Sequence, residues 1–237
     1  MLPADLLSAE AEALAALQQA LASSANGRWT VEFRFEGLRL LPLVLRLNGA
    51  LREAGQELNL LFADMGATAL ARRDAGEGTT NISSFGDQER RQAEGLTDSS
   101  SDSFSNGLLL LVGASQAEYE QVERICGAHV GPVVLLNPSL EDATVGIGSV
   151  ARQRRRGFLA QWQAAYALIP QSDSALRRAF PGDWELYRLD PDGFRFVVGF
   201  ERRPDSEQRQ QALSGGESQG LGGNLRALGD LIEGLQN

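Results

Sequence analysis

The chain has 237 residues, of which 43% are hydrophobic, and this is enough for one substantial core. Its net charge of −9 argues against nucleic acid or anionic lipid as the main partner. All 22 basic residues are arginines, which excludes mechanisms that need a lysine, such as a Walker A phosphate loop or a Schiff base. A single histidine (His129) and a single cysteine (Cys126) cannot supply a zinc site or an intrachain disulfide, and we expect no metal and no cofactor.

The start of the chain, MLPADLLSAEAEAL, is acidic and lacks the basic region and cleavage pattern of a signal peptide. No apolar run approaches the ~20 residues that a membrane span needs. We therefore expect a cytoplasmic protein without a membrane span.

Hydrophobic periodicity predicts alternating helices and strands in the first third of the chain. Residues 4–25 are predicted to form an amphipathic helix, with its apolar face made by Leu7, Leu14, Leu17 and Leu21. The elements expected after it are a strand over Trp29–Phe35, a helix over Leu43–Ala54 that stops at Gly55, a strand over Leu58–Ala63 and a helix over Met65–Arg73.

Residues 75–107 interrupt this pattern because they are polar and rich in glycine and serine. A loop of this length inside a compact domain is either a functional lid or disordered. We predict a flexible insert, disordered over Glu94–Asn106 and partly ordered around Ile82–Asp87.

Regular elements resume at Leu108, and Ser115 and Glu118 have the spacing of a capping box that begins a helix ending at Cys126. The other predicted elements are strands over Leu108–Val112 and Val133–Leu136, an arginine-rich helix over Ser149–Trp162, a strand over Ala164–Ile169, a short helix over Ser174–Phe180, and a hairpin of Trp184–Leu189 and Phe194–Phe200.

Strands that alternate with helices predict a three-layer α/β fold, with a mainly parallel sheet, helices on both faces and a C-terminal antiparallel hairpin. We expect one domain over residues 1–203, a linker over 204–223 and an amphipathic helix over 224–237. The apolar stripe of that last helix consists of Leu225, Leu228, Ile232 and Leu235. Such a helix either docks into a groove of a partner or folds back on its own domain.

Polar residues follow three predicted strands: Asp64 follows Leu58–Ala63, Ser115 follows Leu108–Val112, and Asn137, Glu141 and Asp142 follow Val133–Leu136. We call these five residues the strand-end rim, because the carboxyl ends of parallel strands meet at one edge of a sheet, where ligands bind. The rim could hold a polar ligand or a basic segment of a partner. Alternatively, these residues shape a turn and cap helices. The nearby GIGS turn lacks the third glycine of a dinucleotide fingerprint.

The arginine-rich helix places Arg155 on its apolar face, with Arg152 and Arg156 at the flanks of that face. An arginine in such a position either pairs with a carboxylate or extends its charged end to solvent. One interpretation is therefore an acid–arginine network with Asp64, Glu141 or Asp142. The other is a solvated basic face with one snorkelling arginine.

Cys126 and His129 could be interpreted as a nucleophile and its base. However, Cys126 continues the apolar stripe of Tyr119 and Val122, which favours a buried core thiol. We assign no catalytic residue, and the residues themselves give little support for an enzyme.

The motifs of the chain resemble a family of unknown function from cyanobacteria and chloroplasts. Its plant members include the "low photosystem II accumulation" assembly proteins, and a related domain follows the adenylate kinase in some chloroplast proteins. The segments that carry the resemblance cover most of residues 1–203: LPADL, VEFRF, LFADMGATALARRD, ISSFGD, YEQVERIC, PVVLLNPSLEDATVGIG, RQRRRGFLAQWQAAYALIP and AFPGDWELYRLD.

This resemblance implies a non-enzymatic accessory or assembly factor for the photosynthetic apparatus, acting in photosystem II biogenesis through protein–protein contacts. Its partners would be photosystem II subunits or assembly intermediates, which it would bind in the cyanobacterial cytoplasm or at the thylakoid periphery. The family offers no catalytic residues to carry over, and the adenylate kinase link does not transfer because the phosphate-binding lysine is missing. The alternative is a small-molecule or nucleotide-binding α/β protein, or an enzyme, that uses the strand-end rim.

Overall fold

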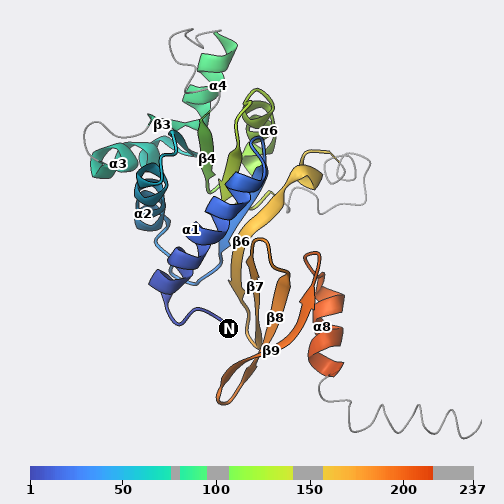
Figure 1. Ribbon diagram of the computed structural model, residues 1–237. Coiled ribbons are helices and arrows are strands. Elements are labelled where there is room, and N and C mark those ends of the chain that lie inside the picture. Colours follow the sequence, from blue (N-terminus) through green and yellow to red (C-terminus); the bar gives the residue numbers. More distant parts are fainter. Residues whose placement is uncertain (76–80, 95–106, 141–156, 216–237) are drawn as a thin grey trace, which may run out of the picture. The chain divides into compact units, whose positions relative to one another are not determined.

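The computed structural model describes residues 1–75, 81–94, 107–140 and 157–215 (Figure 1). These residues form two compact units. The larger unit consists of Pro3–Ile169 and Arg178–Gly182, and the smaller unit consists of Met1–Leu2, Pro170–Arg177 and the described chain from Asp183 onward.

The larger unit is built on a parallel sheet with the strand order β3-β2-β4-β5-β1-β6. Its strands are β1 (Arg28–Phe33), β2 (Leu58–Phe62), β3 (Asn81–Ser84), β4 (Leu108–Val112), β5 (Val133–Leu136) and β6 (Gln163–Pro170). Every residue of β2, β4 and β5 is buried. Continuous runs of leucine and valine, such as LLLLV, are typical of parallel strands that are covered on both faces.

Helices pack on both faces of this sheet. They are α1 (Leu6–Ser23), α2 (Leu40–Glu53), α3 (Met65–Ala75), α4 (Phe85–Ala93), the 3-10 turn η1 (Gln116–Glu118), α6 (Tyr119–Gly127) and the 3-10 turn η3 (Leu159–Gln161). Leu109 and Leu111 pack with the buried side chains of α4 and α6 in one core cluster. Because side chains alternate along a strand, Leu110 points to the other face, and its burial there is complete.

The smaller unit contains the antiparallel pair of β8 (Trp184–Asp190) and β9 (Gly193–Phe200), together with α8 (Ser206–Gly215). The strand β7 (Ser174–Ala179) begins in this unit and ends in the larger one. Gly193 supplies the positive φ of 123° that the hairpin turn requires. The predicted α/β class, with its mainly parallel sheet and C-terminal antiparallel hairpin, is confirmed.

Several local predictions agree with the structure. The strands over Leu108–Val112 and Val133–Leu136 have the predicted bounds. The capping box of Ser115 and Glu118 is present, and α2 is followed after its C-cap by the predicted stop residue, Gly55, with φ 85°. Each of these features depends on residues close together in the chain.

The apolar face predicted for the first helix is only partly correct. Leu17 is buried, but Leu7 is 69% exposed, and the buried positions are otherwise alanines: Ala9, Ala13, Ala16 and Ala20. Small side chains let α1 lie close to the elements beneath it, so the buried face consists mainly of alanines together with Leu17.

The insert expected over residues 75–107 has regular structure where partial order was predicted around Ile82–Asp87, and this order extends over β3 and α4. β3 pairs parallel with β2, and the amide of Asn81 donates to Asn59 Oδ1 over 3.1 Å. The sequence shows no hydrophobic periodicity here, because Ile82 and Phe85 are the only large apolar residues in these two elements, and both are buried. Residues 95–106 lie outside the described part of the chain.

The helix predicted over Ser174–Phe180 is a strand, β7. Short apolar runs cannot be assigned by periodicity alone, and here sheet pairing decides the outcome. The helix predicted over Ser149–Trp162 lies partly outside the described residues. Its described end is a turn and η3, and Trp162 is already extended. Part of the segment expected as a linker, Ser206–Gly215, is the helix α8.

Candidate functional site

The strand-end rim is only partly described, but its described members follow adjacent strands. Asp64 follows β2, Ser115 follows β4 and Asn137 follows β5, and these three strands are neighbours in the sheet. Glu141, Asp142, Arg152, Arg155 and Arg156 lie outside the described residues, as do Leu225, Leu228, Ile232 and Leu235.

Asp64 caps the N-terminus of α3. Its Oδ1 accepts a hydrogen bond from the backbone N–H of Ala67 over 2.7 Å, and its carbonyl accepts one from Thr68 Oγ1 over 2.8 Å. A carboxylate at this position satisfies a helix N–H group that has no partner within the helix. The Asp64 side chain therefore has a structural role as the N-cap of α3.

Ser115 and Glu118 are bonded to each other in the capping box. The Ser115 backbone N–H donates to Glu118 Oε2 over 2.9 Å, the Ser115 hydroxyl donates to the same oxygen, and Ser115 Oγ accepts from Ala117 N over 3.3 Å. The adjoining chain is held in place as well, because Ser139 N donates to Ala114 O over 2.7 Å. The hydroxyl of Ser115 thus belongs to the start of the helix.

Asn137 joins the loop after β5 to the end of β1. Its Oδ1 accepts from Phe33 N over 2.6 Å, and its Nδ2 donates to Phe33 O over 2.9 Å. Its own backbone N–H donates to Val31 O over 2.8 Å. With φ 50°, it is the one residue other than glycine with a positive φ in the described part of the chain, and asparagine tolerates this conformation better than most residues. The Asn137 side chain thus makes the hydrogen bonds to β1 that a further backbone residue of β5 would make if the strand continued.

An acid–arginine pair with a buried carboxylate lies at the same edge, between residues that are not among the predicted site residues. Glu32 is 4% exposed, and its Oε2 accepts hydrogen bonds from Arg34 Nε and Nη2, both over 3.3 Å. Arg34 also donates to the carbonyl of Pro138 and, over 3.4 Å, to Ser139 Oγ. The pair thus anchors the chain that follows Asn137. Its signal in the sequence is VEFRF, where two opposite charges alternate with residues that reach the core.

Cys126 and His129 do not form a nucleophile–base pair. Burial raises the pKa of the Cys126 thiol to about 12, and the interpretation as a core thiol is confirmed. Burial also lowers the pKa of His129, whose Nε2 lies 2.8 Å from the carbonyl of Gly107. Arg28 donates to the carbonyls of Cys126 over 3.3 Å and His129 over 2.9 Å, so this region is a cap for the end of α6.

Residues 3–211 match the model of a protein family described as a domain of unknown function, DUF1995. The chain belongs to the DUF1995 family. A search of the curated proteins finds no match.

In this DUF1995 chain, the described polar groups of the strand-end rim are engaged in capping and loop anchoring. Among the residues described, no group of three or more His, Cys, Asp or Glu side chains is placed to hold a metal ion. Nor does any helix in these segments have the length and apolar character needed to cross a membrane.

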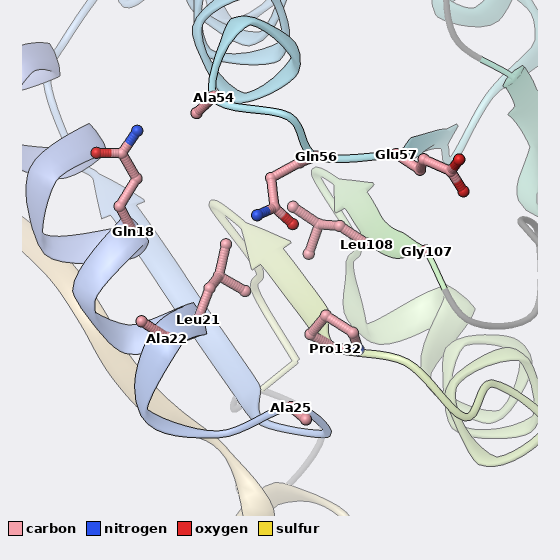
Figure 2. A pocket seen from close by; sticks show the side chains of 10 residues that line it. All are labelled: Gln18, Leu21, Ala22, Ala25, Ala54, Gln56, Glu57, Gly107, Leu108 and Pro132. Atoms are coloured by element: carbon pink, nitrogen blue, oxygen red, sulfur yellow. The ribbon is translucent and has the colours of Figure 1, made fainter.

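This chain also has a pocket at the opposite edge of the parallel sheet, where β2, β4 and β5 begin (Figure 2). Its volume is about 860 Å3, and it lies between the C-terminal ends of α1 and α2. No motif singled out in the sequence lies in this pocket, because its lining residues come from four separate segments: Gln18, Leu21, Ala22 and Ala25; Ala54, Gln56 and Glu57; Gly107 and Leu108; and Pro132.

Proposed function

We propose that this protein is a non-enzymatic accessory or assembly factor for the photosynthetic apparatus, acting in photosystem II biogenesis through protein–protein contacts. The process is inferred from the resemblance of its motifs to the "low photosystem II accumulation" assembly proteins of plants. Membership of the DUF1995 family over residues 3–211 is compatible with this proposal, although the family description names no activity.

The observation that supports the non-enzymatic part of the proposal is that the described residues of the strand-end rim use their polar groups for capping and loop anchoring. Ligands of open α/β sheets bind outside the carboxyl ends of the strands. At this edge the Asp64 carboxylate, the Ser115 hydroxyl and the Asn137 amide each bond to nearby backbone groups. Polar groups used in this way support a structural role better than a catalytic one.

A surface suited to protein contacts lies on the hairpin of the smaller unit. Phe194 is 42% exposed, Phe196 is 58% exposed and Leu189 is 46% exposed. Large apolar side chains that gather on one exposed element are typical of interaction sites, and aromatic residues contribute strongly to binding at such sites. We propose that this surface, which we call the hairpin patch, contacts a photosystem II subunit or assembly intermediate.

The experiment is a crosslinked pull-down with the tagged full chain in a cyanobacterial lysate, read out by mass spectrometry. The matched variants are Phe194→Ser combined with Phe196→Ser, which makes the hairpin patch polar, and Met65→Ser as a control. Met65 is 72% exposed on α3, so its change also removes an exposed apolar side chain, but from another surface.

Wild-type protein and the Met65→Ser control should recover photosystem II subunits, and the hairpin variant should lose them. Recovery of no photosystem subunit by the wild-type chain would overturn the assembly proposal. Equal recovery by the hairpin variant would overturn the choice of contact surface and leave the process intact.

One observation supports the alternative function, which is binding of a small molecule or nucleotide at the strand-end rim. Asp64, Ser115 and Asn137 follow neighbouring strands, as that function requires. A panel of nucleotides and metabolites should then raise the melting temperature, and Asp142→Ala should abolish the shift. A panel without effect would eliminate this alternative.

A further inference from the structure

We propose that the pocket between the ends of α1 and α2 binds an elongated organic cation, an aliphatic di- or polyamine. Its volume of about 860 Å3 is within the range of small-molecule sites. This inference is independent of the proposed assembly function, because the pocket lies at the amino ends of β2, β4 and β5 and not at the strand-end rim.

Two helix C-termini give the pocket a negative potential. Leu21 and Ala22 belong to the last turn of α1, and Ala54 is the C-cap of α2. Each helix end carries roughly half an elementary negative charge from its last carbonyl groups. At α2 the backbone N–H groups of Ala54 and Gly55 fold back onto helix carbonyls, over 3.1 Å and 2.8 Å. At α1 the C-cap, Ser24, is extended, with φ −153°, and the carbonyl of Ala20 accepts a hydrogen bond from the Ser23 hydroxyl over 2.7 Å.

The lining has acceptors and a carboxylate but no cation. None of its ten residues, all within the described chain, is basic, although the protein has 22 arginines. Glu57 adds a full negative charge, and its carbonyl accepts the Leu108 N–H over 2.7 Å, which holds this residue beside the pocket. A phosphate or carboxylate ligand would find no cationic side chain in this lining and would be repelled by Glu57, whereas an ammonium group would be attracted.

The shape of the lining favours a ligand with an apolar middle. Figure 2 shows Glu57 on the side of the pocket away from α1, with Leu108 lying between them. Leu21 and Pro132 complete this apolar part, and Gln18 and Gln56 bring amide groups. A methylene chain can cover the apolar side chains while its amino groups reach Glu57 at one end and the carbonyls of α1 at the other.

The test compares two ligands of equal length, 1,8-diaminooctane and 1,8-octanediol, by isothermal titration calorimetry with the full chain at low ionic strength. The diamine should bind with one-to-one stoichiometry. The diol should bind at least about tenfold more weakly, because it lacks the charges that the helix ends and Glu57 attract.

Three variants separate this pocket from the general attraction of a chain with net charge −9 for cations. Glu57→Gln should weaken diamine binding about fivefold, as expected for one partly exposed charge contact. Glu53→Gln removes an equal charge from an exposed position on α2 outside the lining, and it should leave the affinity within about twofold. Ala22→Trp changes an exposed residue of α1, should not impair folding, and should abolish binding by filling the pocket.

The proposal would be overturned if the diamine gave no saturable heat, or if the diol bound as tightly as the diamine. Diamine binding that persists unchanged in Ala22→Trp would also overturn it, because the amine would then be held elsewhere on the acidic surface.

Discussion

Replacement of Asn137 by alanine tests whether its side chain holds the loop after β5 to β1. The alanine variant loses two hydrogen bonds to Phe33, over 2.6 and 2.9 Å, and Phe33 is only 2% exposed, so water cannot easily replace them. Two buried backbone groups without partners cost about 1–3 kcal/mol each, and alanine at a positive φ adds about 1 kcal/mol. We therefore expect Asn137→Ala to lower the free energy of unfolding by about 3–7 kcal/mol.

Asn137→Gly separates the two contributions. Glycine accepts φ 50° without strain, so this variant should lose only the hydrogen-bond part and be about 1 kcal/mol more stable than Asn137→Ala. Asn81→Ala is the matched control, because it removes an amide that donates a hydrogen bond to Asn59 at an exposed strand end. Its expected cost is about 0.5–1 kcal/mol.

The assay is urea denaturation followed by circular dichroism, combined with hydrogen exchange of the segment that contains β1. Both Asn137 variants should unfold at lower urea concentration, and the Phe33 amide should exchange faster while the amides of β4 stay protected. A loss below about 0.5 kcal/mol in Asn137→Ala, or unchanged exchange at Phe33, would refute the idea that this amide supports the end of β1.

Other predictions concern buried groups of the larger unit. Burial lowers the folded-state pKa of His129 below its ordinary value of 6.5, so between these two pKa values the unfolded chain binds a proton that the folded chain does not. The free energy of unfolding should therefore decrease as the pH drops below about 6.5, until the pH reaches the folded-state pKa of His129. Urea midpoints measured from pH 8 to pH 5 should show this slope, and His129→Gln should reduce it; an equal slope in the variant would contradict the assignment. Cys126, with its pKa raised to about 12, should not react with a thiol reagent at pH 8 until the protein unfolds, and rapid native labelling would show that the thiol is accessible. Arg28→Gln should lower stability by about 1–3 kcal/mol, since it removes a charged donor from four backbone carbonyls near the end of α6; a urea midpoint equal to wild type would count against this cap.

The candidate site shows where inference from the sequence stops. The order of strands and helices correctly indicated that Asp64, Ser115 and Asn137 follow strands of one parallel sheet. It could not choose between ligand binding and capping, because that choice depends on which backbone groups lie within hydrogen-bond distance. The structure shows each of these side chains bonded to backbone, and in Asn137 the partner is 104 residues away.

The sequence did not predict the Glu32–Arg34 pair, because this contact too depends on the tertiary structure. Two residues at alternate positions of a strand point to the same face, but their charges alone do not tell whether that face is covered. Here Glu32 is almost completely buried, and Arg34 reaches the carbonyl of Pro138 on a separate loop. Such a pair is recognisable only when the elements that cover the strand are known.

The sequence by itself determined those structural features of this protein that depend on neighbouring residues in the chain. The continuous leucine and valine runs of β2, β4 and β5, the capping box of Ser115 and Glu118, and the hairpin turn at Gly193 each depend on a few neighbouring residues. Tertiary structure alone decided that β7 is a strand, that the polar segment after Asn81 adds β3 and α4, and which residues line the pocket at the amino ends of the strands. These outcomes depend on pairing and burial between segments far apart in the chain, where long-range contacts outweigh weak local preferences.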